Sequence, residues 1–169
     1  MGPTVRRAAL LTCAAALAGT LTGCSWFGGG SNGSSSESVF KVQPGQCFTT
    51  PSEVKAELSK LNQVPCTNKH TEEAYAVVAY QQRDGAGQVA SSTATSGYPG
   101  SDVLDTFAKG VCAQKFGRYV GIDYLDSSLY YTYLLPSARS WEQDDDRMVT
   151  CFVTTTGGTL TKSVKGSRQ

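Results

Sequence analysis

Strand-forming residues gather in four runs of the chain, separated by stretches rich in glycine, serine, proline or charge. The runs lie at residues 46–50, 73–82, 128–135 and 148–155. Valine, tyrosine, phenylalanine and threonine are frequent in them, and these residues favour strands. The run at 73–82 alternates only partly, which is typical of a central strand. Gly157 and Gly158 then predict a turn into a weaker strand at residues 159–164.

Two other segments repeat their apolar residues every three to four positions, which is the spacing of an amphipathic helix. The first covers residues 53–61, and its apolar face contains Val54, Leu58 and Leu61. The second is longer and is expected to begin at Ser101 or Asp102, either of which can cap it, and to end near Tyr119. Its apolar stripe consists of Val103, Phe107 and Val111, continued by Leu104, Cys112 and Phe116.

The remaining segments connect these elements. Residues 84–100 hold glycine, serine and threonine without periodicity and predict a long loop, and residues 138–143 predict one or two helical turns. One main helix and several strands, mostly joined by short turns, predict an α+β domain. We therefore expect an antiparallel sheet with the one main helix packed on it.

The first 23 residues have the composition of a secretory signal peptide. Arg6 and Arg7 are followed by residues 8–21, an uncharged stretch dominated by alanine and leucine. About 20 strongly apolar residues are needed to span a membrane, so this stretch is short for a permanent anchor. We expect residues 1–23 to be removed on export.

The signal peptide ends in Leu21-Thr22-Gly23-Cys24, which resembles the lipobox of bacterial lipoproteins. In such proteins a lipid is attached to the cysteine thiol and the chain is cut just before it. Two or more acyl chains hold a protein firmly in a membrane. The sequence therefore predicts a lipid on Cys24 and a location on the extracytoplasmic face of the cell membrane.

Residues 24–38 read as a lipid-anchored linker and residues 39–169 as one folded domain. Nine of the eleven residues at 28–38 are glycine or serine, a composition typical of flexible coil. The chain has 15 basic and 14 acidic residues, so loss of Arg6 and Arg7 leaves a net charge of about −1. This balance argues against nucleic acid as a partner, because binding it requires a basic face.

Four cysteines belong to the expected domain, namely Cys47, Cys66, Cys112 and Cys151. An even number in an oxidising compartment predicts two disulfides. Sequence order favours Cys47–Cys66 with a short loop and Cys112–Cys151 with a longer one, the second linking helix to sheet. Zinc sites and redox pairs use closely spaced cysteines, and no two of these are nearer than nineteen positions. We expect neither a metal nor a cofactor.

Several short motifs of the domain resemble the septum-formation domain of actinobacterial envelope proteins. They are Val42-x-Pro44-Gly45-x-Cys47-Phe48, Val64-Pro65-Cys66-x-x-x-His70-x-x-Glu73, Cys112, Tyr133-Leu134-x-Pro136, Trp141 and Arg147-x-Val149-x-Cys151. The resemblance covers about residues 42–166. It implies an envelope protein connected with cell division or wall growth, and it implies no catalytic activity or cofactor.

His70 is the only histidine of the chain, and Glu73 lies three residues after it. An imidazole and a carboxylate at this spacing can pair as a pH sensor or as an acid–base couple. Alternatively, His70 fixes the loop after Cys66 and the start of the next strand. No G-x-S-x-G motif accompanies the pair, so the structural role is the preferred interpretation.

Two further groups of residues were candidates for binding. Tyr131 and Tyr133 are expected on one strand face, with Tyr130 on the other, and could form an aromatic platform with Trp141 or belong to the core. The run at residues 144–146 contains three aspartates that could hold a cation, but it lacks the alternating spacing of a calcium loop. A solvated turn is the preferred interpretation of this run.

Two hypotheses on function follow from the sequence. The first is a non-catalytic lipoprotein whose domain binds an envelope protein or a cell-wall partner, with His70, Glu73, Tyr131, Tyr133 and Trp141 as candidate binding residues. The alternative is an envelope hydrolase that uses His70 as a base oriented by Glu73. The first is preferred, because no nucleophile is placed by the sequence to complete a catalytic set.

Overall fold

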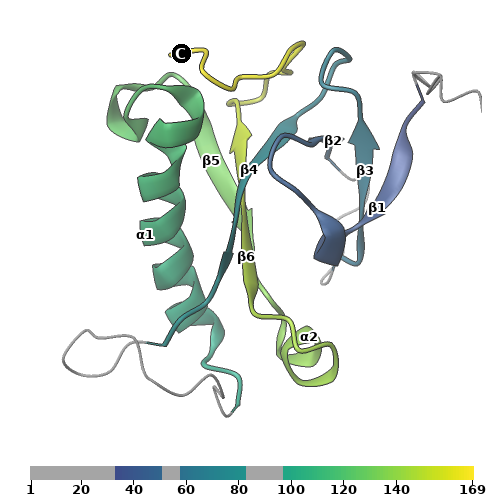
Figure 1. Ribbon diagram of the computed structural model, residues 1–169, viewed down its shortest axis with the longest axis vertical. Coiled ribbons are helices and arrows are strands. Elements are labelled where there is room, and N and C mark those ends of the chain that lie inside the picture. The colour runs from purple at the N-terminus through teal and green to yellow at the C-terminus, as the bar shows by residue number, and fades with distance from the viewer. Residues whose placement is uncertain (1–32, 51–57, 83–96) are drawn as a thin grey trace, which may run out of the picture. The chain divides into compact units, whose positions relative to one another are not determined.

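All the strands belong to one sheet in the computed structural model, which describes residues 33–50, 58–82 and 97–169. The elements are β1 (Ser35–Ser38), η1 (Val39–Lys41), β2 (Cys47–Thr49), β3 (Lys60–Val64), β4 (Glu72–Ala79), α1 (Ser101–Val120), η2 (Tyr124–Asp126), β5 (Tyr130–Leu134), α2 (Ala138–Gln143) and β6 (Met148–Thr154). The strand order is β1-β3-β2-β4-β6-β5, and every neighbouring pair is antiparallel (Figure 1). The α+β prediction is confirmed.

Helix α1 covers one face of the β4–β6–β5 part of the sheet (Figure 1). Its buried residues recur every four positions, at Leu104, Ala108, Cys112, Phe116 and Val120. The predicted cap is wrong, because Gly100 occupies the N-cap position and Ser101 is already helical. Val103 is 47% exposed, so it does not belong to the buried stripe.

The sheet separates two hydrophobic cores. Side chains alternate along β6, so that Val149, Cys151 and Val153 face the helix while Phe152 packs with Phe48 on the other side. A register shift between Ala74 and Ala76 marks a bulge in β4. Both Tyr75 and Ala76 therefore contribute to the core on the helix side.

Both predicted disulfides are present. Cys112–Cys151 joins α1 to β6 with a Cα–Cα distance of 5.6 Å, and both residues are fully buried. Cys47–Cys66 joins the start of β2 to the loop after β3, with a Cα–Cα distance of 5.2 Å. Each closure restricts the unfolded chain and typically contributes about 2–4 kcal/mol.

Three secondary-structure predictions were wrong within the described residues. Residues 35–38, expected as coil, form β1 against β3. Leu61 lies on β3 and not on a helix; most of the predicted helix at 53–61 falls in residues 51–57, outside the described part. Residues 159–164 do not form a strand but make one isolated bridge, between Leu160 and His70.

The other predicted elements either are found in the structure or fall in residues that it does not describe. The strands at 73–82, 128–135 and 148–155 are found with small shifts of their ends, and the short helix at 138–143 is found with the predicted bounds. Most of the predicted loop at 84–100 falls in residues 83–96, which are not described. In the described part of the chain, no helix is both long and apolar enough to span a bilayer.

The packing of α1 generates a stability prediction. Phe116 is fully buried and lies edge-to-face against Tyr75 and Tyr124. We expect Phe116→Ala to lower the free energy of unfolding by about 3–5 kcal/mol, because it leaves a cavity between helix and sheet. Val103→Ala, on the exposed side of the same helix, should change it by about 0.5 kcal/mol or less. Urea denaturation measures both, and equal losses would contradict this assignment of faces.

Candidate functional site

The sequence-predicted pair His70 and Glu73 is brought together at the start of β4, under the C-terminal segment. Both side chains are fully buried. Glu73 pairs with Cys47 of β2 and with Val153 of β6 in the sheet. This central position in the sheet fixes the Glu73 backbone on both sides.

The Glu73 carboxylate accepts three hydrogen bonds. Its Oε1 accepts from the Tyr119 hydroxyl at 2.5 Å and from Ser163 Oγ at 2.6 Å. Its Oε2 accepts from the backbone N–H of Val164 at 2.8 Å. Burial, followed by the hydrogen bond to Glu73, raises the pKa of Tyr119 above its ordinary value. Tyr119 therefore acts as a hydroxyl donor at neutral pH.

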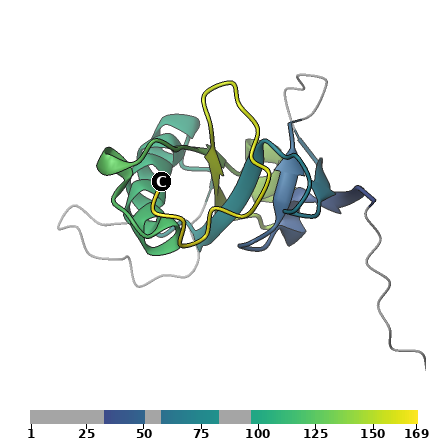
Figure 2. The ribbon, with the colours of Figure 1, turned by 90° about the horizontal axis from the view of Figure 1, so that it is seen from above.

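These donors come from parts of the chain that are distant in sequence. Tyr119 lies in the last turn of α1, and Ser163 and Val164 lie in the segment that follows β6. That segment crosses the end of the sheet and reaches the C-terminal end of α1 (Figure 2). There the N–H groups of Gly166 and Arg168 donate to the carbonyls of Tyr119 and Val120. The segment was predicted as a strand, but the Val164 N–H binds a side chain and not a neighbouring strand.

His70 is held by its backbone and by one ring nitrogen. Its N–H and C=O both pair with Leu160 of the C-terminal segment. Its Nδ1 lies 2.8 Å from the carbonyl oxygen of Asn68, which can only accept, so Nδ1 carries the hydrogen. Its Nε2 is buried, has no hydrogen-bond partner among the described residues and lies 3.9 Å from Glu73 Oε2.

The geometry of this corner favours a structural role, in which His70 and Glu73 hold the C-terminal segment against the sheet, over a catalytic one. A general base must come within hydrogen-bond reach of the substrate, and neither side chain is exposed to solvent. A sulfur of Cys47 completes a group of three donor atoms, with His70 and Glu73, that lie within 4.8 Å of one another. In the oxidised chain this sulfur is bonded to Cys66.

The predicted tyrosine platform lies against α1. Tyr131 and Tyr133 share one face of β5, as predicted, and both are partly buried against the helix-side core. The Tyr131 hydroxyl donates to the carbonyl of Lys109, and the Tyr133 hydroxyl donates to Asp105 Oδ1. Burial, then the hydrogen bond to Asp105, raises the pKa of Tyr133 to about 12. Both hydroxyl groups are therefore engaged within the domain.

Trp141 lies apart from these tyrosines, in α2, and is 1% exposed. The Arg147 guanidinium covers its ring at 3.9 Å and also pairs with Asp145 at 3.0 Å. Asp146 accepts from the Met148 N–H and from Ser140 Oγ. In this turn between α2 and β6, the carboxylates of Asp145 and Asp146 thus already have protein partners.

A groove that was not predicted from the sequence opens beside this turn, on the sheet face opposite α1. Its deeper part has a volume of about 80 Å³. It is lined by Val39, Phe40, Val42, Leu58, Val77, Leu134, Leu135, Ser137, Ser140, Asp146, Met148 and Thr150. Phe40 and Met148 are 54% and 41% exposed at its rim. We call this feature the Phe40–Met148 groove.

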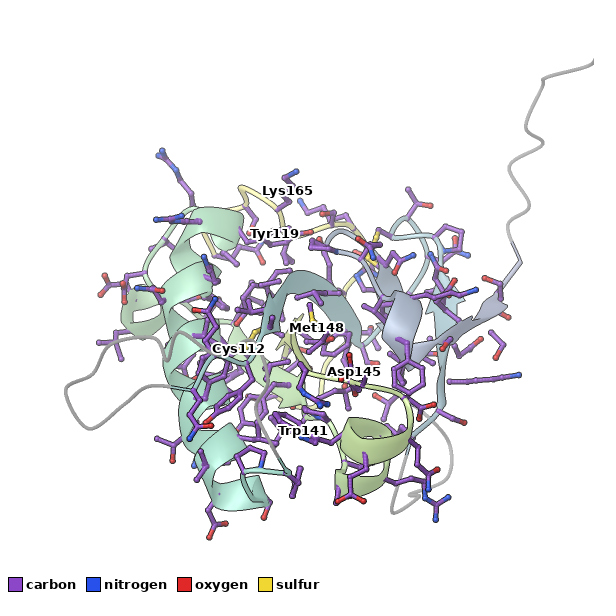
Figure 3. The ribbon with its side chains drawn as sticks, turned by 60° about the horizontal axis from the view of Figure 1, so that its bottom comes forward. Cys112, Tyr119, Trp141, Asp145, Met148 and Lys165 are labelled. Atoms are coloured by element: carbon purple, nitrogen blue, oxygen red, sulfur yellow. A yellow bond between two sulfur atoms is a disulfide. The ribbon has the colours of Figure 1, made fainter. Side chains whose placement is uncertain are left out.

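Acidic residues border the groove on one side. An open depression of about 400 Å³ continues it and is lined by Phe40, Asp144, Asp145, Asp146 and Met148. Figure 3 shows Met148 and Asp145 near each other, with Trp141 close by. No sequence signal pointed to Phe40 or Met148, because each is a single apolar residue whose exposure depends on the fold.

The hydrogen bonds of Glu73 generate a second stability prediction. Tyr119→Phe removes one donor and keeps the ring, so we expect a loss of about 1.5–3 kcal/mol in the free energy of unfolding, which is typical of a hydrogen bond to a charged group. Tyr130→Phe is the matched control, because Tyr130 is 51% exposed on the outer face of β5. Denaturation of both variants measures the difference. An effect of Tyr119→Phe no larger than the control would contradict the assigned bond.

Comparison with known protein families identifies a match to most of the chain. A family model described as septum formation matches residues 43–168, about three quarters of the chain. No curated protein and no solved structure matches the chain significantly. The matched range contains the sheet from β2 onward, both disulfides and the His70–Glu73 corner. The chain therefore belongs to the septum formation family, which is connected with cell division and the envelope and is not a known enzyme family.

Proposed function

We propose that the protein is a non-catalytic lipoprotein of an actinobacterial envelope, whose domain binds a protein partner during septum formation or wall growth. Family membership supports the connection with division. The signal-peptide composition and the lipobox-like residues ending at Cys24 support a lipid anchor on the extracytoplasmic face of the cell membrane.

The observation that carries the binding role is the exposed apolar rim of the Phe40–Met148 groove. Large apolar side chains that stand partly exposed around a concave site mark a surface for contact with another molecule. The deeper part, at about 80 Å³, has room for about one side chain, and the depression of about 400 Å³ that continues it is open to solvent. A shallow open surface with one small cavity matches a protein segment that inserts a side chain better than it matches the enclosed clefts that bury small molecules.

The charge of the rim restricts the partner further. Asp144, Asp145 and Asp146 adjoin the apolar surface on one side. Arg147 pairs with Asp145, but Asp145 is 92% exposed and Asp144 is exposed as well. The occupant that fits is an extracytoplasmic protein segment that presents one apolar side chain next to a lysine or arginine, since complementary charge favours such a pairing.

The hydrolase alternative has less support from the geometry. It requires a substrate to reach His70, and both His70 and Glu73 have no exposed side-chain surface. Glu73 also already accepts from Tyr119, Ser163 and Val164. Opening this corner would require the C-terminal segment to leave the sheet.

Site-specific photo-crosslinking in growing cells tests the proposed binding surface. A benzophenone-bearing phenylalanine analogue replaces Phe40 in one variant and Leu125 in the other. Leu125 is the matched control, because it is apolar, 87% exposed and absent from the groove lining. We expect crosslinks from position 40, and not from 125, to an extracytoplasmic segment with an apolar residue beside a basic one.

Addition of Met148→Lys should abolish the crosslinks from position 40, because a positive charge at the rim repels a basic segment. Identical crosslinked peptides at positions 40 and 125 would contradict the proposed surface. Crosslinks only to lipid or to wall glycan would contradict a protein partner.

The proposed anchor has its own test. Cys24→Ser should abolish incorporation of a labelled fatty acid into the protein, because the thiol is the only acceptor at the predicted cleavage site. The variant should then leave the membrane fraction. Retained fatty-acid label in Cys24→Ser would overturn the lipid anchor and leave the binding proposal unaffected.

A further inference from the structure

In the part of the chain that the structure describes, the buried Nε2 of His70 faces an acceptor atom and no hydrogen-bond donor reaches it. Nδ1 carries its hydrogen toward Asn68, so the lone pair of a neutral ring lies on Nε2. That lone pair faces Glu73 Oε2 at 3.9 Å inside a fully buried corner. Two acceptor atoms in this arrangement direct lone pairs into the same buried space, as the ligands of a metal ion do.

Several details match the surroundings of a metal site. A histidine ligand usually donates its second ring N–H to a carbonyl or carboxylate, as Nδ1 does to Asn68 here. Ligating carboxylates are themselves hydrogen-bonded, as Glu73 is by Tyr119 and Ser163. Within the described part of the chain, Oε2 accepts only the Val164 N–H and retains a second lone pair. The outer contacts that orient ligands are thus already formed.

The sulfur of Cys47 supplies a third donor, within 4.8 Å of the other two. Tetrahedral zinc places nitrogen, oxygen and sulfur ligands about 3.3–3.6 Å apart, given its bond lengths of about 2.0–2.3 Å. The most distant pair of donors needs to approach by about 1.2–1.5 Å to reach this spacing, and a freed Cys47 thiolate can rotate toward the centre. In the oxidised chain the bond to Cys66 prevents this, because zinc binds thiolate and not a disulfide sulfur.

We infer that reduction of the Cys47–Cys66 disulfide creates a buried zinc site formed by Cys47, His70 and Glu73, with Cys66 as the fourth ligand. This goes beyond the proposed function and does not depend on it. The sequence argued against zinc because the cysteines are nineteen positions apart, but the fold brings them to one corner. In the reduced form the ion would hold the start of β2 to the loop after β3, as the disulfide does in the oxidised form.

The two disulfides differ in their access to a reductant. Cys66 is only half-buried, whereas Cys112 and Cys151 are fully buried. A dithiol reductant attacks Cys66 Sγ as thiolate, Cys47 leaves as thiolate, and the second thiol of the reductant releases Cys66. The dithiol becomes a disulfide, the chain gains two thiols, and zinc binding displaces their protons. Cys112–Cys151 should stay closed under the same conditions.

Cobalt(II) titration of the reduced, purified full chain tests the inference. We expect one Co²⁺ per chain, with a thiolate-to-metal charge-transfer band and tetrahedral ligand-field bands, and displacement by Zn²⁺. The oxidised chain should show no thiolate band, and the Cys47→Ser, Cys66→Ser double variant should lose it. Two results would overturn the inference: a band that persists in the double variant, or no band in the reduced wild type.

A variant outside the ligand set separates a positioned site from chance binding. Ser163→Ala removes one hydrogen bond to Glu73, and Ser163 lies in an exposed segment. We expect a loss of about 10–100-fold in zinc affinity with the bands preserved, as is typical for groups that orient a ligand. Unchanged affinity would overturn the role of Glu73.

X-ray absorption of the zinc-loaded, reduced wild type needs no variant. A mixed shell of sulfur and lighter ligands is expected. An all-sulfur shell, or a shell without sulfur, would overturn the assignment.

Discussion

The buried carboxylate of Glu73 is the constraint on which the arrangement of this domain depends. An ionised carboxylate removed from water costs several kcal/mol unless hydrogen bonds replace the lost hydration. Here Tyr119, Ser163 and Val164 supply them. Since these donors belong to α1 and to the C-terminal segment, one side chain on β4 determines where both of them lie.

The two disulfides support this arrangement from either side. Cys112–Cys151 connects the middle of α1 to β6, and Cys47–Cys66 closes the loop that leads to His70. Tyr75 adds a hydrogen bond from the sheet to the helix carbonyl of Cys112. The helix side of the sheet is thus held by covalent and polar links, whereas the opposite side carries the Phe40–Met148 groove. The proposed partner surface and these links therefore lie on different faces of the sheet.

The sequence was sufficient for the elements whose pattern is local. Strand β6 and helix α1 have strong propensity and spacing, and the cysteine order identified both bridges. It was not sufficient for β1 and β3, because serine-rich and mixed polar segments become strands only through pairing, β1 with β3 and β3 also with β2. The segment after β6 was misassigned because a side chain, Glu73, takes the place of a neighbouring strand.

The distinction between local patterns and long-range contacts also applies to the His70–Glu73 corner. The spacing of His70 and Glu73 suggested a pair, and the structural role preferred for His70 agrees with its contacts to Asn68 and Leu160. Their complete burial and the approach of Cys47 depend on residues up to 91 positions away, such as Val164. Local patterns do not contain this information.

Native-state hydrogen exchange at the Val164 amide tests most directly whether Glu73 holds the C-terminal segment. If it does, this amide exchanges slowly in the wild type, and Glu73→Gln accelerates its exchange far more than that of Val153 in β6. Fast exchange in the wild type, or equal acceleration at both amides, would contradict the account.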